Sequence, residues 1–348
     1  MPNPHSIAVV IGRWQLPHLA HLALIRKAFE LADTVVVVIG SARRSRNPKN
    51  PFTAVERQAM LDSMLEDEQR ARVRFLPVRD YYDDKRWVHA VQQGVQSLAA
   101  REAAARPDIC LVGFNKNESS YYLDLFPNWR FVDSGSAMKV DGAALRDVFF
   151  SEGDFARVLA PYVHPGVIAY LQAWKALPEY RERLEEKKAV DAYRARYTGP
   201  CYLTADSVLE INGHVLLIRR GGNIGHGQWA LPGGFVDPHE TFYRAALREL
   251  GEETGYKPLR ATMDAALQAQ AVFDDPTRSP RGRLVTKAFH FRQALNRLPE
   301  VRGEDDAKEA VWWPVERLSE IEEELFEDHA VILDRFIPFM DAARTAAD

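Results

Sequence analysis

Three glutamates in the second half of the chain have a spacing that suits metal binding. Glu249, Glu252 and Glu253 stand at positions i, i+3 and i+4 of the segment GFVDPHETFYRAALRELGEETGY, residues 234–256. On a helix these side chains share one face, beside an apolar stripe at positions 242, 245, 246 and 250. Three like charges repel one another, and a divalent cation with oxygen ligands would compensate them. The plainer interpretation is a solvated acidic helix face.

A longer pattern surrounds these glutamates and favours the metal site. The spacing G-x5-E-x7-R-E-U-x-E-E-x-G-U is filled at every fixed position, by Gly234, Glu240, Arg248, Glu249, Leu250, Glu252, Glu253, Gly255 and Tyr256. The segment resembles the Nudix box. The resemblance implies that the three glutamates hold Mg²⁺ or Mn²⁺ on a nucleoside diphosphate while water attacks phosphorus, with Glu252 and Glu253 also counted as catalytic. It implies that Arg248 and Glu240 orient the helix, that Gly234 permits a tight loop and that Gly255 ends the helix.

A segment rich in arginine indicates which diphosphate this site takes. FDDPTRSPRGR, residues 273–283, contains Arg278, Arg281 and Arg283, whose forked donors suit phosphate. This segment and GHGQWALPGGF, residues 225–235, resemble Nudix domains that hydrolyse ADP-ribose, particularly those fused to an adenylyltransferase. The alternative for the arginines is an exposed loop. A fourth acidic ligand or a base is expected from a later loop, with Glu304, Asp305 and Asp306 as candidates.

Two histidines near the start of the chain suit phosphate binding. GRWQLPHLAH, residues 12–21, follows an apolar run and precedes apolar residues at near-helical spacing. In an open α/β sheet, ligands bind where such strands end, and a helix N-terminus offers backbone N–H groups to phosphate. His18 and His21 can donate hydrogen bonds to phosphate oxygens, and Gly12 lets a nucleotide approach the backbone. The alternative is a structural role for both histidines.

This stretch resembles the (H/T)xGH nucleotidyltransferases in the form found in nicotinamide-mononucleotide (NMN) adenylyltransferases. Trp14 replaces the usual Phe and Ala20 the usual Gly. Residues 50–61 and 113–129 also match family segments, although Asn117 stands where an Asp is common. The resemblance implies adenylyl transfer from ATP to NMN without a protein nucleophile. It implies catalytic roles for His18, His21 and Arg146, and it implies ATP or NMN contacts from Gly12, Arg13, Trp14, Gln15, Asp80, Trp87 and Lys116.

Two of these positions carry alternatives of their own. Trp87 matches a tryptophan that stacks on the nicotinamide ring in relatives, and ordinary packing is its alternative. At residues 140–146 the family has the motif I-S-x-T-x-[IL]-R, where two hydroxyls and an arginine meet ATP phosphates. Here Arg146 is kept, but Asp141 and Ala143 replace the hydroxyl residues. Asp141 can cap a helix but is a poor neighbour for triphosphate.

The elements that would position these residues indicate an α/β protein of two domains. Apolar runs at 7–11, 35–39, 73–78 and 109–112 alternate with helical patterns such as 54–65 and 87–104, which predicts a parallel sheet. We expect a Rossmann-like nucleotidyltransferase domain at 1–178 and a charged linker helix at 179–199. A Nudix α/β/α sandwich with a mixed sheet is expected at 200–348. Within it, runs at 207–211 and 214–218 flank Asn212-Gly213, a hairpin signal, and a helix is predicted near 240–255.

Composition excludes several other classes. The chain has 348 residues, a net charge of -4 and a pI of about 6.2, which argues against a protein that binds nucleic acid through a broad basic surface. Its two cysteines, Cys110 and Cys201, cannot form a disulfide framework. The apolar run at 7–11 is too short for a signal peptide and the run at 35–39 is too short to span a membrane. We therefore expect a cytoplasmic protein without a nucleic-acid or membrane partner.

The sequence thus predicts a bifunctional enzyme of NAD metabolism that acts on ATP, NMN and ADP-ribose and uses Mg²⁺ or Mn²⁺. One alternative keeps the Nudix hydrolase with another dinucleotide, such as NADH or a dinucleoside polyphosphate. A second makes the N-terminal domain a nucleotide sensor without turnover, which the changes at Asp141 and Ala143 favour. A Nudix-like effector module in a regulator is disfavoured by the full set of glutamates. A homo-oligomer is compatible with the sequence.

Overall fold

The computed structural model describes residues 5–101, 107–114, 118–135 and 140–340. The chain divides into two compact units. The first consists of Met1–Arg43 and Lys49–Arg181, and the second of Arg44–Pro48 and Glu182–Asp348. A short piece early in the chain therefore belongs to the second unit.

The first unit is built on a parallel sheet, as predicted. Its five strands lie in the order β3-β2-β1-β4-β5. They are β1 (His5–Gly12), β2 (Ala32–Ile39), β3 (Val73–Pro77), β4 (Ile109–Gly113) and β5 (Arg130–Asp133). Strand β2 contains four consecutive valines, 35–38, that are fully buried. Burial on both faces explains why such strands are continuously apolar and not alternating.

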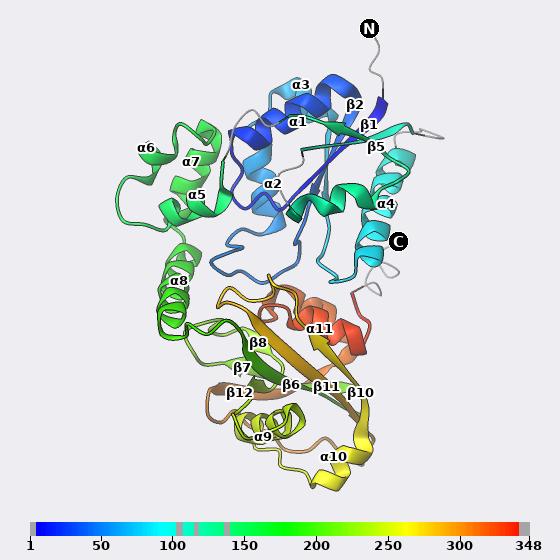
Figure 1. Ribbon diagram of the computed structural model, residues 1–348, viewed down its shortest axis with the longest axis vertical. Coiled ribbons are helices and arrows are strands. Elements are labelled where there is room, and N and C mark those ends of the chain that lie inside the picture. The colour runs from blue at the N-terminus through cyan, green and yellow to red at the C-terminus, as the bar shows by residue number, and fades with distance from the viewer. Residues whose placement is uncertain (1–4, 102–106, 115–117, 136–139, 341–348) are drawn as a thin grey trace. The chain divides into compact units, whose positions relative to one another are not determined.

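Helices cover both faces of this sheet, with α2 and α4 on opposite sides of it (Figure 1). The helical elements are α1 (Leu19–Leu31), α2 (Ala54–Asp62), α3 (Asp67–Arg72), α4 (Asp84–Arg101), η1 (Glu118–Leu125), α5 (Gly142–Phe149), α6 (Phe155–Leu159) and α7 (Pro165–Trp174). Helix α2 begins at a capping box in which the hydroxyl of Thr53 accepts from Glu56 N and Glu56 accepts from Thr53 N. Helix α4 begins three residues before the predicted start at Trp87.

The second unit is built on a mixed sheet, as predicted. Strands β10-β11-β6-β7-β12 form its main path, with β8 paired to β7 and β9 to β6. Only β6 and β11 run parallel among the described pairs. The strands are β6 (Tyr202–Ile211), β7 (His214–Arg220), β8 (Trp229–Ala230), β9 (Gly233–Phe235), β10 (Leu267–Phe273), β11 (Leu284–Gln293) and β12 (Ala307–Pro314).

The predicted hairpin joins β6 to β7. Asn212 and Gly213 both have positive φ, 50° and 74°, which is the backbone that a tight two-residue turn requires. Glycine and asparagine adopt this conformation at the lowest cost. The turn therefore sets the register in which His214 faces Ile211.

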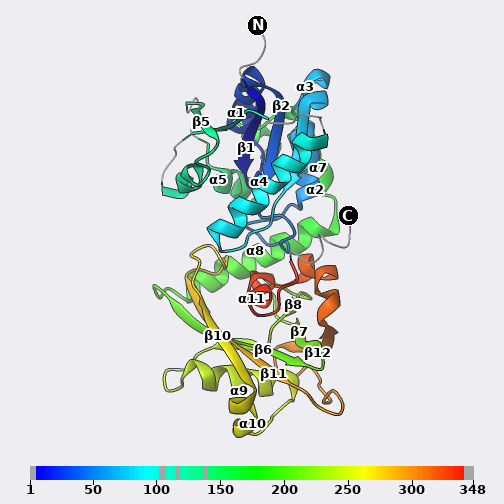
Figure 2. The same ribbon diagram turned by 90° about the vertical axis from the view of Figure 1, so that its right-hand side faces the viewer.

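Helices α9 (Phe242–Thr254) and α11 (His329–Phe336) lie on opposite faces of the second sheet (Figure 2). The unit also contains α10 (Arg260–Ala266) and the short helices η2 (Val315–Glu320) and η3 (Glu322–Glu324). Ala245, Ala246 and Leu250 of α9 are fully buried in the core against Phe289 and Phe291 of β11. Helix α9 begins two residues after the predicted start, because Thr241 caps it by accepting from Arg244 N.

The charged segment that follows the first sheet forms helix α8 (Pro178–Arg196). From Glu182 onward it belongs to the second unit. It is not solvated on every side, because Arg183, Glu186 and Val190 are buried. Glu186 accepts a hydrogen bond from Gly225 N at 2.9 Å and pairs with Arg183 at 3.2 Å. These partners satisfy a charge that the sequence pattern places on a solvated face.

None of the helices in the described ranges combines the length and the apolar character that crossing a membrane requires.

Candidate functional sites

The loop after β1 is held in one conformation by tight packing. Trp14 has a φ of 55°, is almost fully buried and donates from Nε1 to Val38 O at 2.7 Å. A Cβ added to Gly12 would lie 2.9 Å from the Trp14 ring, so only glycine fits there. Gly12 O also accepts from Gly40 N at 2.8 Å. The replacement of Phe by Trp in this motif thus adds a hydrogen bond between the loop and β2.

The two predicted histidines lie together at the start of α1. Their rings stack with centroids 3.6 Å apart and planes 16° apart. His18 N lies 3.3 Å from His21 Nδ1, and the ring of Trp14 meets His21 edge-on at 4.7 Å. Both imidazoles therefore occupy the junction of β1 and α1, where the sequence predicts phosphate binding.

Gln15 and Arg57 fix the backbone around this junction. The Gln15 amide is used by Phe52, donating to its carbonyl at 2.8 Å and accepting from its N–H at 3.2 Å. Arg57, buried on α2, donates to the carbonyls of Arg13, Gly40 and Ser41 at 2.6, 2.6 and 3.1 Å. The sequence pattern does not reveal the role of Arg57, because the three loop carbonyls that it contacts lie at least 16 residues away in the sequence.

The altered 140–146 stretch lies beside the same loop. Asp141 caps α5, its Oδ1 accepting from Ala143 N at 2.9 Å. Arg146 Nη1 donates to Gln15 O, and burial lowers the pKa of Arg146. A Cβ on Gly142 would lie 3.5 Å from Gln15 O, so the start of α5 touches the loop. The predicted Arg146 is thus brought to the histidine loop, and the unexpected Asp141 carboxylate is occupied by the helix end.

The residues predicted to bind NMN have fewer contacts with the histidine loop than Arg146 has. Trp87 lies edge-on to Tyr122 and Phe126, with centroids 6.0 and 5.7 Å apart. Tyr122 OH lies 3.4 Å from Ile11 O, so this aromatic group reaches the end of β1. Asp80 is half-buried in the segment between β3 and α4. Lys116 lies outside the described residues.

In the second unit, Arg248 gathers the carboxylates of the box. It donates to Glu240 Oε2 at 2.7 Å, to Glu249 Oε1 at 2.8 Å and to Glu252 Oε2 at 2.9 Å. Its Nη2 also donates to Phe235 O at 2.9 Å. Arg248 therefore fixes both the helix and the loop before it.

The loop of β9 is pressed against this helix. A Cβ on Gly234 would lie 2.3 Å from Glu249 Oε1, so the close approach requires glycine. Gly233 N donates to Glu253 Oε2 at 2.9 Å. Gly255, at φ 69°, ends α9 in the left-handed conformation, as predicted from the box.

The carboxylates of the box are surrounded by too little positive charge to offset their burial. Burial raises the pKa of Glu253 to about 8, and it also raises the pKa of Glu249. Among the described residues, no three His, Cys, Asp or Glu side chains converge tightly enough to hold a metal, since Arg248 binds Glu249 and Glu252 while Glu253 turns toward Gly233. A hard divalent cation fits this set of oxygen donors, because it would supply the missing charge.

The later acidic loop lies at the end of α9. Glu304 N donates to Glu253 O at 3.0 Å, and a Cβ on Gly255 would lie 3.4 Å from Glu304 Oε1. The charge of Asp305 contributes to the raised pKa of Glu249. Asp306 O accepts from Gly221 N at 2.8 Å. Glu304 and Asp305 thus stay close to the box, whereas Asp306 contacts Gly221, and the geometry singles out none of the three.

The three predicted arginines differ in their surroundings. Arg278 forms a buried two-point ion pair with Asp328, both contacts at 2.8 Å. Arg281 pairs with buried Glu327 at 3.0 Å, and Ser279 Oγ donates to the same carboxylate at 2.6 Å. Arg283 is exposed and donates from Nη1 to Asp274 O. Two of the arginines therefore hold their loop on the residues before α11, and neither carboxylate partner was anticipated.

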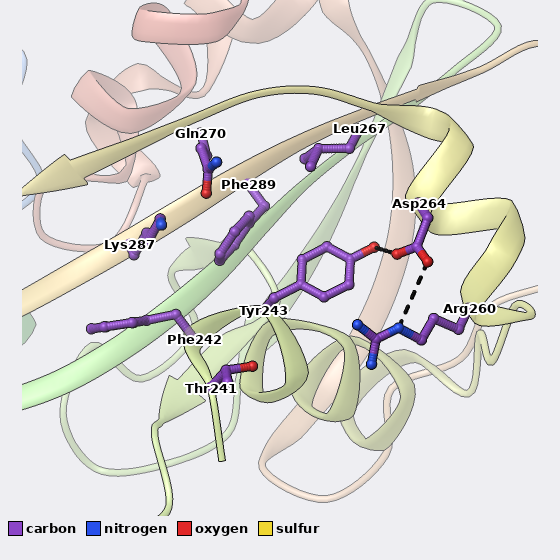
Figure 3. Close-up of a pocket in the computed structure, with 9 residues that line it drawn as sticks. All are labelled: Thr241, Phe242, Tyr243, Arg260, Asp264, Leu267, Gln270, Lys287 and Phe289. Carbon is purple, nitrogen blue, oxygen red and sulfur yellow. Dashed lines mark hydrogen bonds and ion pairs between the residues drawn. The ribbon is translucent and has the colours of Figure 1, made fainter.

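A pocket of about 420 Å³ opens elsewhere on this unit, between α9, α10, β10 and β11 (Figure 3). Figure 3 shows the rings of Phe242, Tyr243 and Phe289 around it. Tyr243 OH donates to Asp264 Oδ1 at 2.6 Å, and Asp264 lies 3.7 Å from Arg260. None of the box carboxylates is among its lining residues. The pocket is therefore separate from the acidic site.

Comparison with known proteins matches a different family model in each half of the chain. Residues 9–117 match the family model described as cytidylyltransferase-like, and residues 203–336 match the NUDIX domain. A nicotinamide/nicotinic acid mononucleotide adenylyltransferase of Acinetobacter baylyi is 35% identical over 185 residues, which are 53% of this chain and 94% of the relative. An ADP-ribose pyrophosphatase of Methanocaldococcus jannaschii is 32% identical over 155 residues, 44% of this chain and 83% of the relative.

A solved structure is similar over nearly the whole chain. It is a crystal structure of a bifunctional NMN adenylyltransferase/ADP ribose pyrophosphatase from Francisella tularensis, complexed with AMP and a Mn ion. The match has a TM-score of 0.87 and 29% identity, and it covers 95% of this chain and 98% of the other.

Proposed function

Because the chain belongs to the family of bifunctional NMN adenylyltransferase/ADP-ribose pyrophosphatases, we propose that each unit carries out one of these two reactions. The first unit transfers the adenylyl group of ATP to NMN, which gives NAD and pyrophosphate. The second hydrolyses ADP-ribose to AMP and ribose 5-phosphate. One observation supports this conclusion most directly: the same chain contains both sites. The box carboxylates gather around Arg248 next to Gly233 and Gly234, and the His18 and His21 rings stack in the first unit.

In adenylyl transfer, the phosphate of NMN attacks the α-phosphorus of ATP and pyrophosphate leaves. The protein positions the reactants and neutralises charge. We assign donors to the triphosphate from His18 and His21, at the start of α1. Arg146 supports this group by holding the carbonyl of Gln15 and closing the loop on α5.

The remaining predicted contacts complete the first site. We propose that the nucleotide approaches the backbone at Gly12 and Arg13, in the loop after β1. Trp87, supported by Tyr122 and Phe126, is proposed as the face for the nicotinamide ring, with Asp80 nearby in sequence. Trp14 and Gln15 shape the loop through their hydrogen bonds to Val38 and Phe52.

Hydrolysis by the second unit depends on a divalent cation, and we propose Mg²⁺ or Mn²⁺. When bound, the cation neutralises the diphosphate and makes a water more acidic. Glu249, Glu252 and Glu253 would hold it. Arg248 and Glu240 keep these carboxylates on one side of α9. When the cation binds, Arg248 would give up part of its hydrogen bonds to Glu249 and Glu252.

Two further assignments follow from burial. We propose that Arg283 meets substrate directly, whereas Arg278 and Arg281 hold the loop through Asp328 and Glu327. We also propose a cytoplasmic location, which the two unpaired thiols support, Cys110 being buried and Cys201 exposed.

A crossed assay tests the proposal. Wild type, Glu252→Gln and His18→Ala are each incubated with ATP plus NMN and with ADP-ribose, in the presence of Mg²⁺, and products are identified. Glu252→Gln should lose hydrolysis and keep NAD synthesis, because it removes a metal ligand from one unit. His18→Ala should lose about 10²–10³ in the rate of synthesis and keep hydrolysis.

Matched variants control for nonspecific effects. The exposed residues Glu323 and His89 are changed to Gln and Ala, and both activities should stay at wild-type level. If wild type forms neither product, or if hydrolysis persists in excess chelator, the assignment is wrong. If wild type hydrolyses ADP-ribose but makes no NAD at any ATP concentration, the first unit is a sensor.

A further inference from the structure

Four aromatic rings gather beside the acidic site of the second unit. Tyr193 and Tyr197 come from the end of α8 and the residues after it, Tyr202 begins β6 and Phe235 ends β9. Tyr197 is 36% exposed and Phe235 is 37% exposed. Large rings exposed together need a reason, because exposed aromatic surface is unfavourable in water.

We propose that Tyr197 and Phe235 form a clamp that binds the planar base of the nucleoside diphosphate substrate. This inference rests on the proposed hydrolase function and adds residues that select for the base. The box carboxylates are proposed to act on the diphosphate through a cation, so recognition of the base is assigned to other residues.

The geometry of the two rings carries the proposal. Their planes are 18° from parallel and their centroids lie 6.3 Å apart. Stacked aromatic rings lie about 3.4 Å apart, so a ring–base–ring sandwich spans about 6.8 Å. The faces of Tyr197 and Phe235 are at most 6.3 Å apart, so the rings have to separate by at least about half an ångström to admit a base.

Other contacts hold the two rings in place. Tyr202 meets Tyr197 and Phe235 edge-on, at 5.8 Å and 87° and at 6.2 Å and 79°. The Tyr202 hydroxyl accepts from Gly199 N at 2.7 Å, which fixes the segment that leads from α8 to β6. Tyr193 lies 4.5 Å from Tyr197, and Arg196 lies over the Tyr197 ring at 5.3 Å. The clamp is therefore preorganised, which lowers the entropy lost on binding.

The clamp lies next to the groups proposed to bind the diphosphate. Phe235 directly follows Gly234, against which Glu249 packs, and its carbonyl accepts from Arg248. On the other side, Tyr202 N donates to Arg283 O at 2.9 Å. A base between the two rings would therefore lie near the metal carboxylates, which the phosphates of the same nucleoside diphosphate could then reach.

The ligand class follows from the chemistry of stacking. Every base has an aromatic face, and stacking on aromatic side chains is tolerant of base identity. The clamp should therefore favour substrates that contain a base over fragments without one, and purines over pyrimidines because their rings are larger.

The test measures ADP-ribose hydrolysis together with inhibition by its two products. Tyr197→Ala and Phe235→Ala should each raise the KM for ADP-ribose and the inhibition constant of AMP about tenfold or more, with kcat little changed. The inhibition constant of ribose 5-phosphate, which has no base, should stay at its wild-type value. A purely structural defect would weaken both inhibitors alike.

Conservative variants separate stacking from general apolar contact. Tyr197→Phe should behave as wild type, and Phe235→Leu, which keeps apolar bulk without a ring, should behave as Phe235→Ala. Unchanged AMP inhibition in both alanine variants would overturn the clamp. If an alanine variant unfolds, the comparison of Phe235→Leu with Tyr197→Phe decides. A wild type that leaves ADP-ribose intact instead overturns the hydrolase assignment, which distinguishes the two failures.

Discussion

Asp206 shows how strongly burial controls the ionisation of single residues around the acidic site. Its carboxylate is fully enclosed on β6 beside Gly233 and accepts a hydrogen bond from Thr286 Oγ1. Burial raises its pKa to about 6, although the charge of Arg278 acts in the opposite direction. An acid whose pKa is raised on folding stabilises the protein while it is protonated. That stabilisation is lost as the pH rises through the pKa of the folded state.

Asp206→Asn should therefore stabilise the second unit at high pH. The neutral amide avoids the cost of ionising a buried group, and Arg278 keeps its ion pair with Asp328. The advantage of the variant should grow by about 1 kcal/mol between about pH 5 and about pH 8. Urea unfolding in the presence of chelator measures this, with exposed Asp237→Asn as the control for net charge. If the difference in unfolding free energy between variant and wild type shrinks as the pH rises, the predicted direction of the effect is wrong.

Local spacing is what makes individual residues predictable here. The box residues all fall within 23 positions, 234–256, so one helix and one loop bring them together and the sequence shows it. Arg278 with Asp328, and Arg281 with Glu327, are pairs separated by 50 and 46 residues. These pairs form only when α11 packs on the sheet, so the local sequence shows the arginines but not their carboxylate partners. The clamp of Tyr197 and Phe235 was missed for the same reason.

At the scale of elements, the start of α5 carries a prediction about ATP. The Asp141 carboxylate caps the helix through Ala143 N, at one of the two positions where the motif of the resembling family has hydroxyl residues. Asp141→Ser with Ala143→Thr keeps a capping side chain and adds two donors, each worth about 1 kcal/mol. The double variant should lower the KM for ATP about tenfold or more and leave hydrolysis unchanged. Steady-state kinetics check this, and an unchanged KM would show that the triphosphate does not reach α5.

The end of α9 carries a prediction about stability. Gly255 has a φ of 69°, a conformation that costs a residue with a Cβ about 1–2 kcal/mol. Gly255→Ala should lower the unfolding free energy of the second unit by about this amount. Gly222→Ala is the control, because its Cβ would meet open space and its φ is not positive. Equal stability of the two variants in urea would mean that the helix end relaxes without cost.

The sequence predicts the elements that are marked by a continuous apolar run or by a turn signal. The four predicted strands of the first sheet each overlap an observed strand, and the hairpin turn forms at Asn212 and Gly213. Short strands such as β8 and β9, two and three residues long, have no period to detect. The buried face of helix α8 cannot be recognised from the sequence, because it includes the charged residue Glu186. Gly225 N and Arg183 are the partners of this carboxylate.

At the scale of the whole molecule, the chain enters the second unit twice. Residues 44–48 contribute three hydrogen bonds within it. Arg44 donates to Arg278 O at 3.0 Å. Arg46 O accepts from Arg183 at 2.8 Å and from Gln228 at 3.0 Å. A fragment of residues 182–348 lacks them. Its unfolding free energy should be lower than that of the second unit in the full chain by about 2–3 kcal/mol. Loss of hydrolase activity with urea measures both, and equal midpoints would contradict the contribution of this segment.

The double entry of the chain also limits how its gene can be divided. A single break in the coding sequence at residue 181 yields one product that carries five residues of its neighbour and another product that lacks them. A recombination event that moves the second half alone into another gene carries away an incomplete fold. Any division of the chain that is meant to keep the second unit intact therefore has to retain residues 44–48 with it.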